Sequence, residues 1–136
     1  MVKVIKKILA VAFVLAFFSL KGMAQGGTYD VFVPISKYIT QGDAEKLSAW
    51  FSDNLEVSIK SSASNSSKNQ ACQIMKNFFE DNTPRSFEIT HTTGEGNMKY
   101  AIGMLKAGGE SFQITIFVNS DGSTYKIQQL KIDRMP

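Results

Sequence analysis

The last third of the chain, residues 86–134, constrains the fold most strongly. Four runs rich in β-branched and aromatic residues follow one another there, separated only by turn-sized gaps. Ala107-Gly108-Gly109 and Asn119-Ser120-Asp121-Gly122 between these runs are typical of hairpin turns. The sequence therefore predicts an antiparallel meander of four strands, and we expect the preceding residues to pack against it.

The final strand, residues 124–134, changes phase along its length. Tyr125 and Ile127 lie at odd positions, whereas Leu130 and Ile132 lie at even ones. A β-bulge near Gln128-Gln129 would bring all four side chains onto one face. A strand buried on both faces would explain the pattern too, but charged residues interrupt it, so we predict the bulge.

Three helices are predicted before this meander. Apolar residues recur at helical spacing in residues 30–41, 44–51 and 71–79. Asp30 and Asp43 are predicted to cap the first two helices, and Gly42 to end the first. Residues 55–60 alternate between apolar and polar side chains, which predicts a half-buried strand. Residues 61–68 are small and polar and predict a surface loop, which contains a formal glycosylation sequon at Asn65.

The first 24 residues have the pattern of a signal peptide. Lys3, Lys6 and Lys7 precede an apolar run from Ile8 to Leu20, which is shorter than the ~20 residues that a membrane-spanning helix needs. Small residues at Gly22 and Ala24 predict cleavage before Gln25. We therefore expect an exported, periplasmic or secreted protein with a single domain at residues 25–136 and no stable membrane anchor, rather than an uncleaved anchor.

Cleavage would change the charge of the protein. The whole chain has 15 basic and 12 acidic residues, and Lys3, Lys6, Lys7 and Lys21 would be removed. Eleven basic residues against the same 12 acidic ones leave a formal charge of −1. The basic character thus belongs to the precursor and gives no support for a nucleic-acid partner. Cys72 is the single cysteine, so no intrachain disulfide is expected.

The order of these elements resembles a known superfamily. The segment 39–57, with Gly42-Asp43-Ala44 between two helices and Leu47 four residues before Phe51, is similar to the start of nuclear transport factor 2-like domains, also called cystatin-like. Gln70-Ala71, Phe78-Phe79 and the ending 125–132 resemble a family of small exported bacterial proteins that is a domain of unknown function. The resemblance implies an α+β fold in which three N-terminal helices pack on a strongly curved antiparallel sheet, forming a cone.

Such a cone can hold a pocket, and we expect a modest apolar one here. Seven side chains are predicted to line it: Tyr38, Trp50, Phe78, His91, Tyr100, Met104 and Phe112. His91 is the one weak catalytic candidate, since it is the only titratable residue expected to point inward. The carboxylates alternate with apolar residues and should face solvent. The single His and single Cys lack metal-ligand spacing, so no metal or cofactor is predicted.

The opposite face of the sheet is expected to mediate a homodimer. Its predicted residues are small or apolar and nearly uncharged: Ala101, Gly103, Leu105, Thr115 and Phe117. The leading interpretation is an exported binding or interaction domain for a small apolar ligand, without catalytic machinery. Two alternatives stay open: an isomerase-like or hydratase-like enzyme that uses His91 in the cone, and a structural component of an envelope assembly.

Overall fold

The computed structural model describes residues 29–136, so the predicted signal peptide, residues 1–24, lies outside the described part of the chain. The described residues contain no helix long and apolar enough to cross a membrane. In chain order the elements are α2 (Phe32–Gln41), α3 (Ala44–Ser48), β1 (Phe51–Ile59), β2 (Ser62–Ser67), α4 (Lys68–Asp81), β3 (Pro84–Glu95), β4 (Met98–Ala107), β5 (Glu110–Ser120) and β6 (Tyr125–Arg134).

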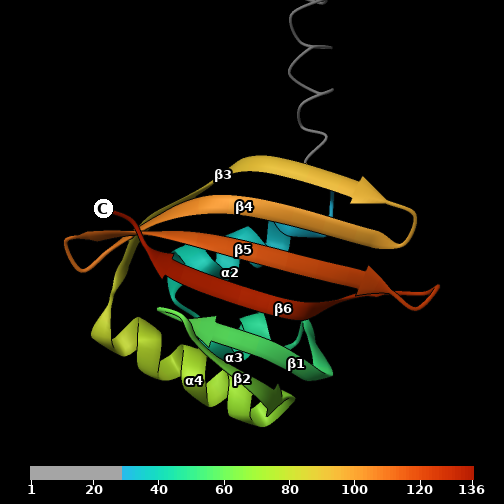
Figure 1. Ribbon diagram of the computed structural model, residues 1–136, viewed down its shortest axis with the longest axis horizontal. Coiled ribbons are helices and arrows are strands. Elements are labelled where there is room, and N and C mark those ends of the chain that lie inside the picture. The colour runs from blue at the N-terminus through green and yellow to red at the C-terminus, as the bar shows by residue number, and fades with distance from the viewer. Residues whose placement is uncertain (1–28) are drawn as a thin grey trace, which may run out of the picture.

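The strands form one six-stranded sheet with the order β2-β1-β6-β5-β4-β3. All neighbours are antiparallel except β1 and β6, which run parallel. The helices lie together behind the sheet in Figure 1 and leave its other side uncovered. The α+β class is therefore confirmed. A strand was predicted between the second and third helices, but the structure has two there, β1 and β2, before α4. The sheet is not strongly curled.

The two faces of the sheet have different environments. We call them the helix-covered face and the open face. The core strands present alternate apolar residues to the helix-covered face, and these side chains are fully buried: Ala101 and Leu105 on β4, Phe112, Ile114, Ile116 and Val118 on β5, and Ile127, Leu130 and Ile132 on β6. Because strand residues alternate in direction, the side chains between them define the open face.

The predicted bulge in β6 is confirmed. Phe117 pairs with Gln129 and Val118 pairs with Ile127, so Gln128 is the extra residue. Tyr125 packs against the core on the same side as the buried Ile127, Leu130 and Ile132. The one inserted residue thus places the apolar side chains at odd positions before it and at even positions after it on the same face of the sheet.

The junction between the first two helices is as predicted. Gly42 ends α2 with φ +66°, the left-handed conformation that glycine adopts without strain, and Asp43 caps α3 by accepting a hydrogen bond from the Lys46 amide at 3.0 Å. The prediction that Asp30 caps α2 is wrong, because Val31 is the N-cap and no side chain caps this helix.

The second helix is shorter than predicted. It ends at Ser48, and Phe51, which was expected in the helix, begins β1. The Trp50 carbonyl accepts a hydrogen bond from the Ile127 amide at 2.6 Å. Pairing with β6, a contact between residues far apart in the sequence, therefore competes with continuation of the helix.

Residues 61–68 are not a loop, and that prediction is wrong. Ser62–Ser67 form β2, which pairs with β1 along its whole length at the edge of the sheet. Only Ser66 of this strand is buried. The strand has no apolar periodicity because it buries almost nothing, so the pattern on which the prediction depended is absent.

Helix α4 has the predicted stripe and a complete capping box. The Ser67 hydroxyl accepts from the Gln70 amide at 3.2 Å, and the Gln70 side chain accepts from the Ser67 amide at 2.9 Å. Ala71, Met75 and the Phe78-Phe79 pair are buried against the sheet. Asn82 is the C-cap, just before Pro84 begins β3.

Candidate functional site: the open face of the sheet

The structure divides the seven expected pocket residues between two locations. Phe78 and Phe112 lie in the core under the sheet, where their rings meet edge to face with centroids 5.2 Å apart. Tyr38 and Trp50 are partly buried and pack against the same core. These four residues fill the space between helices and sheet.

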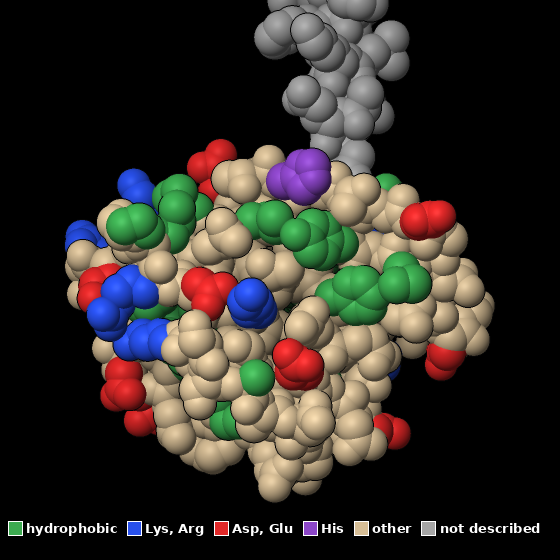
Figure 2. Space-filling view, in the orientation of Figure 1, with side chains coloured by type: hydrophobic (Ala, Val, Ile, Leu, Met, Phe, Trp, Pro, Cys, Tyr) green, Lys and Arg blue, Asp and Glu red, His purple; other side chains and the backbone are tan. Residues whose placement is uncertain are grey.

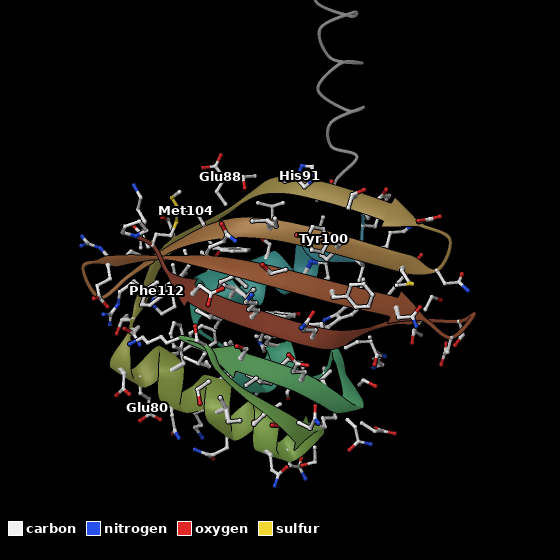
Figure 3. All side chains as sticks on the ribbon, in the orientation of Figure 1. Glu80, Glu88, His91, Tyr100, Met104 and Phe112 are labelled. Atoms are coloured by element: carbon white, nitrogen blue, oxygen red, sulfur yellow. The ribbon has the colours of Figure 1, made fainter. Side chains whose placement is uncertain are left out.

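The other three, His91, Tyr100 and Met104, lie on the open face and do not meet the first four (Figure 3). His91 changes sides because of a bulge: Ile89 pairs with Gly103, but His91 pairs with Ile102, which leaves Thr90 as the extra residue. A bulge in β3 was not predicted, and the strict alternation assumed there placed His91 on the wrong face.

The two faces of β4 are the reverse of those that we predicted. We expected the larger residues Tyr100, Ile102 and Met104 to point toward the helices. Instead Gly103 faces them, because the Phe87 ring of β3 crosses the position where a side chain of residue 103 would lie. The small residue is required by a neighbour from another strand, which the spacing within β4 cannot show.

The predicted dimer face is therefore wrong for three of its five residues. Ala101 and Leu105 are fully buried under the helices, and Gly103 is buried beside them. Thr115 and Phe117 do lie on the open face, between the buried Ile114, Ile116 and Val118.

An apolar band occupies the middle of the open face. It consists of Met98, Tyr100, Ile102 and Met104 on β4 and Phe117 on β5. Tyr100 and Phe117 are direct cross-strand partners, and Met98 is 47% exposed. Figure 2 shows apolar side chains gathered over the middle strands of this face. Met98 and Ile102 were not predicted to lie on the surface, although their alternation with the buried Ala101 and Leu105 could have indicated it.

Polar side chains surround the apolar band. On β3 these are Glu88 and His91, both exposed. On the opposite side, the Gln129 amide donates to Glu56 Oε2 at 3.1 Å, and Lys131 Nζ lies 3.8 Å from Asp133 Oδ2. The open face thus has an apolar centre within a polar rim.

The described residues offer no cluster of metal-binding side chains, and one carboxyl group has a shifted pKa with a clear cause. Within residues 29–136 no three His, Cys, Asp or Glu side chains are grouped so that they could hold a metal ion. Asp121, in the turn before β6, has a pKa below its ordinary value. Hydrogen bonds donated by the Ser123 and Thr124 amides and by the Ser123 hydroxyl lower the pKa of its carboxyl group.

The surface formed by residues 29–136 includes shallow depressions at three places. One of about 380 Å³ lies at the α2–α3 corner beside α4, one of about 460 Å³ lies where β4 turns into β5, and one of about 350 Å³ lies beside the turn after β1. None of the seven expected pocket residues lines any of these three depressions.

The fold is shared with solved proteins of low sequence identity. A protein from Bacteroides ovatus has a TM-score of 0.74 at 22% identity, and the match covers 76% of this chain and 94% of that one. A related protein from Bacteroides uniformis has a TM-score of 0.73 at 21% identity, with 76% and 95% coverage. A cystatin-like domain of unknown function from Nostoc punctiforme has a TM-score of 0.64 at 9% identity, with 82% and 77% coverage.

The family comparison agrees with these structures. No curated protein matches this chain. The two Bacteroides proteins are both members of the DUF4783 family. The model of that family, a domain of unknown function, matches residues 32–133, which span the domain from α2 to nearly the end of β6. The chain therefore belongs to the DUF4783 family and has the nuclear transport factor 2-like, or cystatin-like, fold.

Proposed function

We propose that this protein is an exported interaction domain that forms a homodimer through the open face of its sheet. One observation carries the proposal: the apolar band of Met98, Tyr100, Ile102, Met104 and Phe117 lies on the face that the helices leave uncovered. An apolar centre with a polar rim is the usual composition of a protein–protein interface.

The size of the open face supports a second copy as the partner. Five strands of 9 to 12 residues and the six-residue β2, spaced by roughly 4.8 Å and rising about 3.3 Å per residue, give a face on the order of 900 Å². Each partner buries about this area in a stable interface of standard size. A face of this kind can pair with an identical face around a two-fold axis, because the same patch then serves both subunits.

The interior supports an interaction surface better than it supports a ligand pocket. Phe78 and Phe112 pack against each other, and Phe32, Phe51 and Met75 around them are almost completely buried. Close packing of this kind fills the volume that a small apolar ligand would need. The hypothesis of an enzyme requires His91 to point into the cone, but His91 is exposed on the open face.

The export part of the proposal is supported by the sequence of the first 24 residues. Their lysine-rich start and apolar run predict cleavage before Gln25. We expect the protein recovered from the envelope or the medium to begin at Gln25, as determined by mass spectrometry of the intact chain. Recovery of the full-length chain from the cytoplasm would contradict export and leave the dimer to be tested separately.

The dimer is tested by placing a charge in the apolar band. We expect the protein to have twice the monomer mass in light scattering, and Phe117→Glu to have the mass of a monomer, because a carboxylate buried in an apolar interface costs several kcal/mol. Val33→Glu is the matched control, since Val33 is an apolar side chain, 61% exposed, on helix α2. A monomeric unmodified protein, or an unchanged mass for Phe117→Glu, would contradict the proposal.

A further inference from the structure

The depression of about 460 Å³ lies at one end of the open face, beyond the apolar band. It forms where β3 begins and where the β4–β5 turn lies. Its lining comes from three adjacent strands and their turn: Arg85, Ser86, Lys106, Ala107, Gly109, Glu110 and Ser111. Its volume falls in the range of about 300–1,000 Å³ that small-molecule sites occupy.

The pairing of the strands places three polar side chains in one row across this depression. Ser86 of β3 pairs with Lys106 of β4, and Lys106 pairs with Ser111 of β5. Lys106 lies between the buried Leu105 and Ala107, so its side chain projects from the open face. Arg85 is the extra residue at a shift of register between Pro84 and Ser86, which brings a second cation to the same depression.

The backbone beneath this row is held by contacts between distant residues. The Gly108 amide donates to the Thr83 carbonyl at 3.2 Å, which ties the β4–β5 turn to the residue before β3. The Met135 amide donates to the Ser111 carbonyl at 2.8 Å, which ties the start of β5 to the end of the chain. The backbone that carries the row is therefore fixed, so binding a ligand would have to order only the side chains.

The positive charges of the depression are not neutralised by the protein. Among residues 29–136 the ion pairs within 4.0 Å are Lys76–Glu45, Lys131–Asp133 and Arg134–Glu110, so neither Arg85 nor Lys106 pairs with a carboxylate there. Glu110 is the one carboxylate in the lining, and its Oε1 lies 3.3 Å from Arg134 Nε. Two cations and two serine hydroxyls thus line the depression, and its one carboxylate pairs with Arg134 instead of with them.

We propose that this depression binds an oxyanion group, phosphate or carboxylate, carried by a small molecule such as an acidic sugar. The Arg85 guanidinium offers a planar pair of donors that matches two oxygens of such a group, and Lys106 supplies a second positive charge. The hydroxyls of Ser86 and Ser111 can donate to the remaining oxygens. The depression lies at one end of the open face, beyond the apolar band at the centre of the proposed dimer interface, and its lining includes no residue of that band.

The test is titration of the protein with glucose 6-phosphate, glucuronate and uncharged glucose at constant ionic strength, by calorimetry and by amide chemical shifts. We expect saturable binding of at least one acidic sugar, shifts concentrated at Ser86, Lys106, Gly109 and Ser111, and no binding of glucose. Tighter binding of glucose 6-phosphate would identify phosphate as the preferred group, and tighter binding of glucuronate would identify carboxylate. The variant Arg85→Ala/Lys106→Ala should bind the acidic sugar with an affinity lower by about tenfold or more. Hydrogen bonds that involve a charged group contribute more to affinity than neutral ones do.

Two controls separate a specific site from general attraction of anions. Lys37→Ala/Lys46→Ala removes two exposed lysines from helices α2 and α3 and should leave binding unchanged. Phe117→Glu should also bind the acidic sugar with unchanged affinity, whatever its oligomeric state. Equal affinity of the Arg85→Ala/Lys106→Ala variant, equal loss in the lysine control, or replacement of the sugar by chloride at the same concentration would overturn the proposal.

Discussion

Gly103 is the residue on which the orientation of β4 depends. A Cβ atom built at this position would lie 2.5 Å from Phe87 Cε1 and 2.9 Å from the Glu88 carbonyl oxygen. We expect Gly103→Ala to lower the free energy of unfolding by about 1–3 kcal/mol, as overpacking of a core does. Urea denaturation of the two proteins measures the difference.

A second substitution shows whether the Phe87 ring causes this loss. In the variant Phe87→Leu/Gly103→Ala the smaller side chain leaves room for the new methyl group. The combined loss should therefore be smaller than the sum of the two single losses. Additive losses would mean that the Glu88 carbonyl, and not the ring, opposes a side chain at residue 103.

The contribution of Asp121 to the stability of the turn before β6 depends on pH. Its pKa is lowered from 3.8 by amide and hydroxyl donors, so its contribution to stability is fully present above pH 3.8 and is lost as the pH falls through the lower folded value. The stability of Asp121→Asn relative to the unmodified protein should therefore be lower at about pH 5, with the difference shrinking toward about pH 2. A difference that grows in acid would contradict this assignment.

The β1–β2 hairpin turns through two residues in an unusual conformation. Lys60 and Ser61 have φ angles of +53° and +71°, which are those of a type I′ turn. Asn-Gly is preferred in such turns, because both residues adopt positive φ at low cost. We expect Lys60→Asn/Ser61→Gly to stabilise the domain by about 1 kcal/mol in thermal unfolding.

The matched control for this hairpin is Ser62→Gly. Ser62 is the first residue of β2, so glycine there should weaken the strand by a few tenths of a kcal/mol to about 1 kcal/mol. Stabilisation by both variants would indicate that β2 is strained throughout and would contradict the explanation from turn geometry. Lys-Ser is a poor turn signal, which is a second reason why the sequence did not reveal β2.

Among the elements, those with a strong apolar period were predictable. Helix α4 could be predicted because Ala71, Met75, Phe78 and Phe79 form one stripe, and the bulge in β6 because Ile127 and Leu130 break a clear alternation. The end of α3 depends on pairing with β6, far along the chain, and the bulge in β3 depends on pairing with β4. Strand β2 pairs with the adjacent β1 but has neither an apolar period nor a typical turn sequence. No local pattern encodes that pairing, so these features were missed.

For the whole molecule, the two faces of the sheet predict losses of stability of different size when an aspartate is introduced. Leu105 is fully buried under the helices, whereas its neighbour Met104 is partly exposed on the open face. Leu105→Asp should therefore lower the free energy of unfolding by more than about 3 kcal/mol, and Met104→Asp by less than about 1 kcal/mol. Denaturation of the two variants at a concentration low enough to keep both monomeric compares them directly.

The opposite order of the two stability losses would contradict this assignment of the faces. If Met104→Asp were the more damaging change, the helices would cover the side of β4 that carries Tyr100, Ile102 and Met104. The proposed dimer face would then consist of the small residues Ala101 and Gly103, as the sequence analysis expected. Circular dichroism of the two variants before denaturation shows whether each still folds.

The sequence by itself determined the class of fold, the meander and the apolar stripes, because each follows from spacing between near neighbours in the chain. The side of the sheet to which each residue points was decided only by the tertiary structure. The Phe87 ring requires glycine at residue 103, and the bulge at Thr90 turns His91 outward. These two features left His91, Tyr100 and Met104 on the open face, because a change of one residue in register exchanges the two faces of a strand. The expected pocket is a filled core because the Phe78 and Phe112 rings pack against each other there.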